Sequence, residues 1–410
     1  MKAFETSKAA VQTVAALVAA MGLEAGAAAA EVAARMAVER YVPASPDEVV
    51  LRVPARAAND PIAMLEARYS NERTEANAVE LAQLYLQRAR ANREERYFAR
   101  AEALVQPWAN KPEARSSTLR VQAGILQNRH EFDAAITLLD RAISRQPRDA
   151  GARLMRASVK LVQGRAEEAR PDCTAVLAAG EAAAGTICLA QVLGATGELS
   201  RATSLVSRLL APDGRVFEPA SPSSVPLARP IRGWALWILA DFTDRAGDPA
   251  TAEKLLRAAL EMVPDNEGVR SALSDLLLAR GAAREAMDLV DLPSPSLGLL
   301  ARRAHVQTLL RDPAAADTRE RIETLLGPSA RRGDRPHLRE EALVALYVDK
   351  EPERALELAI RNFEAQRETL DVRLLARAAQ SSGDRKALAQ LADWLRESRY
   401  EDRELAGVLR

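Results

Sequence analysis

The sequence predicts an all-α fold, an α-solenoid of antiparallel helix pairs, and three observations support this prediction. Hydrophobic residues make up 48% of the 410 residues but aromatic residues only 4%, so the apolar fraction is mainly aliphatic and rich in alanine, the best helix former. Strands favour β-branched and aromatic side chains, which argues against a β-sandwich or barrel. A turn motif also recurs every 33 or 34 residues, a period typical of helix–turn–helix arrays.

The charge balance restricts the class of partner. Lys and Arg together number 57, and Asp and Glu also number 57, so the formal net charge is zero. This balance gives no electrostatic reason to expect DNA, RNA or an anionic membrane as the main partner. The 28% of charged residues leaves the chain too apolar to be disordered.

Residues 1–30 have the three parts of a secretory signal peptide. Two lysines precede the weakly apolar run 9–23, and Ala28 and Ala30 form a small-residue cleavage site. The run is too short to span a membrane, and no later stretch approaches the required length. We therefore expect a periplasmic or secreted protein without a membrane span. The alternative is a retained alanine-rich helix in a cytoplasmic protein.

Five further regions follow along the chain. A β-branched run bounded by prolines, a cluster of five prolines and three serines, and the weakening of the repeat toward the C-terminus mark the boundaries. We expect an N-terminal linker or extended segment at 31–75, a first helical array at 76–211, an inserted loop at 212–230, central repeats at 231–292, and degenerate C-terminal repeats with a cap at 293–410.

Two cysteines, Cys173 and Cys188, lie 15 residues apart on consecutive antiparallel helices of the expected array. A disulfide can bridge such helices, and an exported location would permit one. The alternative is a pair of free, buried cysteines that act as small hydrophobic residues. There is no CxxC motif and no cluster of the three histidines, so we expect no metal site.

The internal repeat is the strongest signal. A turn residue is followed five positions later by alanine at Gly164, Gly197, Gly247 and Gly281, and in the same frame at His130 and Lys350. In the clearest unit, Gly247 supplies the permissive backbone of the turn. The small residues Ala240 and Ala252 allow two helices to approach closely, and Pro264 ends the second helix.

These residues resemble the tetratricopeptide repeat family. The resemblance rests on small residues at set positions and on terminal prolines, namely Ala123, Ala135, Ala142, Ala240, Ala252, Ala259, Ser274, Ala286, Pro147 and Pro264. The large aromatic residue of the family's first helix is replaced by Leu119 and Leu236. The resemblance implies a right-handed superhelix like that of bacterial repeat proteins of undefined function. A generic alanine-rich helical bundle would have no reason to keep the repeat phase.

The resemblance also implies a concave groove lined by set positions of each first helix. Carried onto this chain, those positions are Trp234, Trp237, Asp241, Asp244 and Arg245, with Asp275 from the next repeat. Two exposed tryptophans beside three acids would suit an extended or helical peptide with basic and apolar side chains. The alternative is that Trp234 and Trp237 belong to the core.

Catalytic motifs are absent from the sequence. It has no GxGxxG, no phosphate-binding P-loop, no GxSxG and no HExxH, so we expect neither catalysis nor a cofactor. The polar cluster Arg331 to Glu341, which includes His337, is interpreted as a solvated loop and an acidic helix start. The alternative is a metal or ligand site.

The sequence therefore predicts a non-enzymatic scaffold that binds a partner protein or peptide on its concave face. The alternative is an accessory subunit of an enzyme or of an envelope assembly complex. A helical-repeat RNA binder is disfavoured by the zero net charge.

Overall fold

The computed structural model describes residues 60–92, 96–211, 227–293, 295–332 and 337–408. All of them belong to one compact unit, Asn59–Arg410. The expected signal peptide at 1–30 and the first part of the expected linker lie outside the described residues, as do residues 212–226 of the expected loop.

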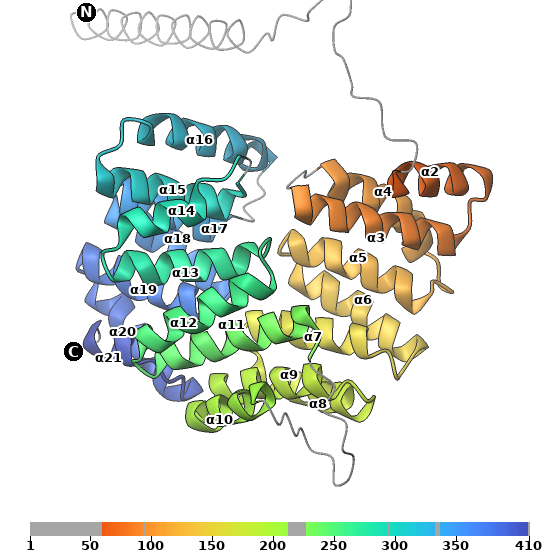
Figure 1. Ribbon diagram of the computed structural model, residues 1–410, viewed down its shortest axis with the longest axis horizontal. Coiled ribbons are helices and arrows are strands. Elements are labelled where there is room, and N and C mark those ends of the chain that lie inside the picture. Colours follow the sequence, from red (N-terminus) through yellow and green to blue (C-terminus); the bar gives the residue numbers. More distant parts are fainter. Residues whose placement is uncertain (1–59, 93–95, 212–226, 294, 333–336, 409–410) are drawn as a thin grey trace, which may run out of the picture. The chain divides into compact units, whose positions relative to one another are not determined.

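The described residues form helices and turns and contain no strand, which confirms the predicted all-α helical repeat fold (Figure 1). The first helices are α2 (Pro61–Asn71), α3 (Glu75–Asn92), α4 (Arg96–Ala109), α5 (Ser116–Asn128), α6 (Phe132–Arg145), α7 (Ala150–Val162), α8 (Ala166–Ala178), α9 (Ala182–Ala195) and α10 (Leu199–Leu210). The central ones are α11 (Arg229–Arg245), α12 (Pro249–Met262), α13 (Glu267–Ala279), α14 (Ala283–Val290), α15 (Leu297–Leu310) and α16 (Ala315–Arg332). The last are α17 (Leu338–Val344), the π-helical turn η1 (Ala345–Asp349), α18 (Pro352–Ala365), α19 (Thr369–Ser382), α20 (Arg385–Ser398) and α21 (Arg403–Val408).

The turn residues of the sequence repeat coincide with turns between paired helices. Their φ angles are all positive, at 61° for His130, 74° for Gly164, 86° for Gly197, 87° for Gly247, 80° for Gly281 and 61° for Lys350. Glycine adopts this left-handed conformation freely, which explains why four of the six turns use it. Arg311 and Gly383 make the same turn after α15 and α19, so the frame continues into the degenerate C-terminal region.

The small residues of the repeat lie where two helices of a pair meet. Ala135, Ala252 and Ala286 have no exposed surface, and Ala240 is 1% exposed. A larger side chain at these positions would hold the helices apart. The second helices α6 and α12 end two residues before Pro147 and Pro264, as the helix-breaking role of proline requires.

Two predicted boundaries differ from the structure. The expected linker 31–75 contains α2, whose N-cap Asp60 accepts a hydrogen bond from the Ile62 amide at 3.0 Å. An Asp followed by Pro61 is a helix-start signal that outweighs the short length of this helix. The expected loop 212–230 is shorter at its end, because α11 begins at Arg229 with Pro230 in its first turn.

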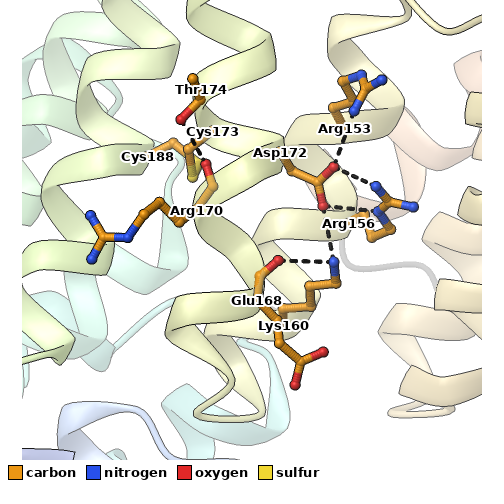
Figure 2. Close-up of a disulfide and its surroundings, with 9 residues drawn as sticks. All are labelled: Arg153, Arg156, Lys160, Glu168, Arg170, Asp172, Cys173, Thr174 and Cys188. Atoms are coloured by element: carbon orange, nitrogen blue, oxygen red, sulfur yellow. Dashed lines mark hydrogen bonds and ion pairs between the residues drawn. A yellow bond between two sulfur atoms is a disulfide. The ribbon is translucent and has the colours of Figure 1, made fainter.

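A disulfide joins α8 to α9 through Cys173 and Cys188, whose Cα atoms lie 5.4 Å apart (Figure 2). Both cysteines are buried. The neighbouring Asp172 points the other way, toward α7, where Arg156 donates two hydrogen bonds to it at 2.9 and 2.5 Å and Lys160 donates one at 3.1 Å. Asp172 therefore connects α8 to α7 through ion pairs, and Cys173 connects α8 to α9 through the disulfide.

The apolar core is divided into local clusters along the solenoid. One cluster gathers buried residues from α15 to α21, and others gather residues of α11 to α15, of α9 to α11, and of the earlier pairs. Helix α15 contributes to two clusters. Its Leu299 and Val306 pack toward α11–α14, whereas Leu300 and Ala304 pack toward the C-terminal helices.

Candidate functional site

Inner helix positions from successive repeats converge on one cavity of about 1250 Å³. The residue six positions before the turn residue lines this cavity in repeat after repeat. These residues are Ser158, Gln191, Asp241, Asp275, His305 and Arg377. The cavity is therefore a product of the repeat register, and its walls come from helices more than 200 residues apart in sequence.

The structure brings five of the six expected groove residues to this cavity, namely Trp237, Asp241, Asp244, Arg245 and Asp275. Trp234 does not line it and packs beside the apolar cluster of α9–α11. The expectation of two exposed tryptophans is wrong, because both side chains are partly buried. Trp237 also packs closely over Gly268, where an added Cβ would lie 2.4 Å from its ring.

Arg245 is turned into the protein and is only 3% exposed. Its guanidinium donates hydrogen bonds to the carbonyl oxygens of Gly194, at 2.5 Å, and Glu401, at 3.0 Å. It also lies over the ring of Tyr400, 3.9 Å from the centroid. Arg245 is thus engaged by the chain's own C-terminal residues, and its charge is only loosely paired with Asp241 at 3.4 Å.

Asp244 and Asp275 each accept hydrogen bonds from an arginine of a later helix. Arg373 of α19 donates to Asp244 at 2.5 Å, and Arg302 of α15 holds Asp275 with two bonds of 2.8 and 2.6 Å. Burial raises the pKa of Asp244, and the Arg373 charge opposes that rise. Both carboxylates therefore bridge helices and are already compensated before any partner binds.

The opposite wall of the cavity was not anticipated from the sequence. The ring of His305 stacks on Tyr347, with centroids 4.4 Å apart and planes 11° apart. Arg377 donates a hydrogen bond to the Tyr347 hydroxyl oxygen at 3.2 Å. Tyr347 lies in the π-helical turn η1, a type of distortion that often occurs at functional sites. Tyr347 lies three residues before the turn residue Lys350, as Asp244 does before Gly247, and this shared position in the repeat is the sequence feature that indicates it.

Burial lowers the pKa of His305 to about 4, and the positive charges of Lys350, Arg377 and Arg302 act in the same direction. The imidazole is therefore neutral near pH 7. Burial also raises the pKa of Tyr347, so its hydroxyl is protonated at that pH. The pair presents an uncharged, flat surface to the cavity.

The interpretation of Arg331 to Glu341 as a solvated segment is wrong for Arg339. Its Nε and Nη2 donate to the two carboxylate oxygens of Asp371 at 2.6 and 2.7 Å, and Nη2 also donates to Glu368 at 2.6 Å. Asp371 is 1% exposed, which makes this an internal ion-pair network.

His337 lies 3.9 Å from Glu340. Within the described ranges, no group of three or more His, Cys, Asp or Glu side chains is arranged to hold a metal ion.

The arrangement provides apolar surface, flat rings and compensated charges, which suits the binding of another chain.

No helix among the described residues has the length and hydropathy to cross a membrane. Fold and cavity together define an all-α helical repeat protein. Residues 245–298 match the model of the tetratricopeptide repeat family, which confirms the resemblance seen in the sequence. The match covers one part of the chain, and the other described residues share its all-α architecture of paired helices.

Several solved structures are similar to parts of this chain. A thermophilic repeat protein of Thermus thermophilus is 21% identical, with 52% of this chain and 98% of that chain covered and a TM-score of 0.34. A repeat protein from Parabacteroides merdae ATCC 43184 is 13% identical, with 77% and 98% covered and a TM-score of 0.35. The Cut9–Hcn1 hetero-tetramer of the APC/C is 16% identical, with 77% and 58% covered and a TM-score of 0.40. A search of curated proteins finds no match.

Proposed function

We propose that this protein is a non-enzymatic scaffold that binds a segment of a partner protein in the cavity lined by Trp237. The tetratricopeptide repeat fold is generally a protein-interaction scaffold. The observation that carries the proposal is the convergence of inner helix positions on one cavity of about 1250 Å³. Pockets for small molecules are usually smaller, roughly 300–1,000 Å³, so the cavity favours a peptide segment.

The charges of the cavity favour a partner segment with apolar side chains. The acids Asp244 and Asp275 are already paired with arginines of the same chain, which removes much of the reason to expect a basic peptide. Apolar surface remains along α11 and α13 at Trp237, Ile238 and Leu276. Burial of such surface is the main favourable term in protein association.

The titratable groups of the cavity support binding rather than catalysis. A general base works best with a pKa near the working pH, and the pKa of His305 is about 4. The arginines near His305 form ion pairs that connect helices. Arg302 of α15 pairs with Asp275 of α13, and Arg377 of α19 pairs with Glu404 of α21, so both have a structural role.

The binding proposal is tested by filling the cavity. Ser271 lines the cavity ten residues before its turn residue, the same register as Trp237. We expect Ser271→Trp to reduce capture of the partner from an extract of the native host by roughly tenfold or more. The matched control is Asp288→Trp on the exposed face of α14, which should capture as well as the unmodified protein. Circular dichroism checks that both variants keep their helical content. Equal capture by both would contradict binding in the cavity.

We further propose that the protein works in an oxidising compartment, the periplasm or the outside of the cell. The support is the buried Cys173–Cys188 disulfide, because cystines persist mainly in oxidising compartments. A reporter enzyme that is active only outside the cytoplasm, fused after Glu31, should be active in the host. An inactive reporter that is nevertheless produced in full would overturn this proposal.

A further inference from the structure

The segment 366–404, called the closing segment below, docks against the turns of four earlier repeats. Gln366 lies at the turn residue His130, with their side-chain nitrogens 3.1 Å apart. The next three turn residues are each covered by an arginine of the closing segment. The pairs are Gly164 with Arg367, Gly197 with Arg399, and Gly247 with Arg403. At Gly281, the turn that follows, an added Cβ would meet nothing within 4 Å.

Polar bonds hold this seam between the closing segment and the turns. The Arg367 amide donates to the Val162 carbonyl oxygen at 2.7 Å. At the start of α10, the Leu199 amide donates to Oε1 of Glu401 at 2.9 Å, so a residue of the closing segment caps a helix 202 residues earlier in the chain. The Arg373–Asp244 ion pair described above also crosses the seam.

Among the described residues, no cluster of buried apolar side chains crosses the seam. The apolar cluster that contains the buried residues of the closing segment has no buried member before Leu300. The clusters of α5 to α12 contain no residue after Val306. Parts of a chain joined by a polar contact, without a shared hydrophobic core, are expected to move relative to each other.

The connection between the two sides is α15, the helix that belongs to both apolar clusters. Residues of the closing segment that line the cavity include Arg367, Arg373, Tyr400 and Arg403. Movement of the closing segment about α15, together with α16 to α18, which share its apolar cluster, would therefore widen the cavity without dividing that cluster.

We propose that the seam is a gate, which opens by rotation about α15 to admit the partner segment and closes over it. That a partner segment enters the cavity rests on the proposed function, whereas the opening of the seam does not. The gate explains how a peptide reaches the part of the cavity around Arg245, which is 3% exposed and contacts Tyr400 and Glu401 of the closing segment. Because charge pairs contribute to the seam, salt should favour the open state.

Amide hydrogen exchange in the full-length protein tests the opening directly. The amides of Leu199 and Arg367 report on the seam, and the amide of Leu273, whose side chain is fully buried in α13, reports on the core. We expect the two seam amides to exchange roughly 100-fold faster than Leu273, and faster still when NaCl is raised from about 0.1 M to about 1 M. Exchange of all three amides at one common rate would overturn the gate.

A disulfide across the seam should lock the gate. A Cβ placed on Gly247 would lie 3.5 Å from the Cβ of Arg403, at the short end of the range of roughly 3.5–4.5 Å found in disulfides. In the oxidised Gly247→Cys, Arg403→Cys variant, we expect exchange at Leu199 and Arg367 to slow by roughly tenfold or more. The matched control is Gly247→Ser with Arg403→Ser, which carries the same backbone strain and cannot cross-link.

Each result of the locking experiment decides the proposal. Slower exchange in the cross-linked variant alone supports the gate, and equal exchange in the cross-linked and serine variants overturns it. If the variant with the first disulfide does not fold, Gly164→Cys with Arg367→Cys is the second choice. The corresponding Cβ separation is 3.3 Å, so a small outward shift brings it into the disulfide range. Because no partner is used, a rigid seam combined with loss of capture by Ser271→Trp would reject the gate and leave the proposed function standing.

Discussion

Arg245 of α11 lies over the ring of Tyr400, 3.9 Å from the centroid, although the two residues are 155 positions apart in the sequence. The same guanidinium donates a hydrogen bond to the carbonyl oxygen of Glu401. A groove position that the repeat family would present to a partner is therefore used to hold the chain's own C-terminal region. The contact is stabilising because it satisfies a buried charge that would otherwise be costly.

Replacement of Arg245 by lysine should lower stability even though the charge is kept. A lysine ammonium cannot reach the carbonyl oxygens of Gly194 and Glu401 in the same forked geometry, and it stacks less well on Tyr400. We expect the free energy of unfolding to fall by about 2 kcal/mol, measured by urea denaturation. Arg208→Lys on the exposed face of α10 should change it by less than about 0.5 kcal/mol. Similar values for the two variants would contradict the role given to Arg245.

Asp172 should contribute more to the stability of the fold than Asp140 does. Both acids accept hydrogen bonds from Arg156, and Figure 2 shows Asp172. Asp172 is 1% exposed and neutralises three cations of α7, whereas Asp140 is 56% exposed. Asp172→Asn should lower the free energy of unfolding by about 3 kcal/mol, because three partly buried positive charges lose a buried partner. Asp140→Asn should lower it by less than about 1 kcal/mol. Equal losses in thermal or urea unfolding would show that burial does not control this cluster.

Much of the fold could be predicted because the repeat is written in local residue types. A glycine turn, an alanine five positions later and a terminal proline, as at Gly247, Ala252 and Pro264, each have a local physical cause. The predicted turns at His130 and Lys350 also have positive φ angles, although neither is glycine. Local chemistry thus predicted the helix pairs, and the family resemblance then supplied the inner positions, including Asp241 and Asp275.

The opposite wall and the seam could not be predicted because they depend on contacts distant in sequence. Nothing near Asp244 indicates Arg373, 129 residues later, as its partner. The repeat register around the turn residue Lys350 indicates Tyr347, but it does not indicate that Tyr347 stacks on His305. Arg339 looked like part of a solvated charge run because its partner Asp371 lies 32 residues away.

The Cys173–Cys188 disulfide should stabilise the array. A bridge that closes a loop of this length contributes about 3 kcal/mol in the chain-entropy description. We expect Cys173→Ala with Cys188→Ala to lower the free energy of unfolding by about that amount. Reductant should lower the urea midpoint of the unmodified protein and leave that of the double variant unchanged. An equal response of both proteins to reductant would rule out this contribution.

Stability should fall as pH decreases from about 6.5 to about 4, in part because of His305. Burial lowers its pKa to about 4 in the folded protein, from 6.5. The unfolded chain therefore binds a proton in this window while the folded protein does not, so acid favours unfolding. The contribution is present in full above about pH 6.5 and amounts to at most about 3 kcal/mol.

The His305→Phe variant isolates this contribution, because phenylalanine keeps a flat ring against Tyr347 and does not titrate. Between about pH 7 and about pH 4.5, its free energy of unfolding should fall less than that of the unmodified protein. Urea denaturation at the two pH values measures the difference. Identical losses in the two proteins would mean that His305 titrates normally.

Gly268 and Gly298 occupy the same place in their repeats, each thirteen residues before the turn residue. Substitution by alanine should lower stability at Gly268 and not at Gly298. A Cβ at Gly268 would lie 2.4 Å from the ring of Trp237, whereas the nearest atom to a Cβ at Gly298 is 3.6 Å away. Alanine stabilises a helix interior by about 1 kcal/mol relative to glycine. Both glycines are the second residue of their helix, where this gain is smaller. We expect Gly298→Ala to be neutral or stabilising. Gly268→Ala should lose about 1–3 kcal/mol because Trp237 must move. Thermal unfolding measures both, and stabilisation by Gly268→Ala would show that Trp237 can move without cost.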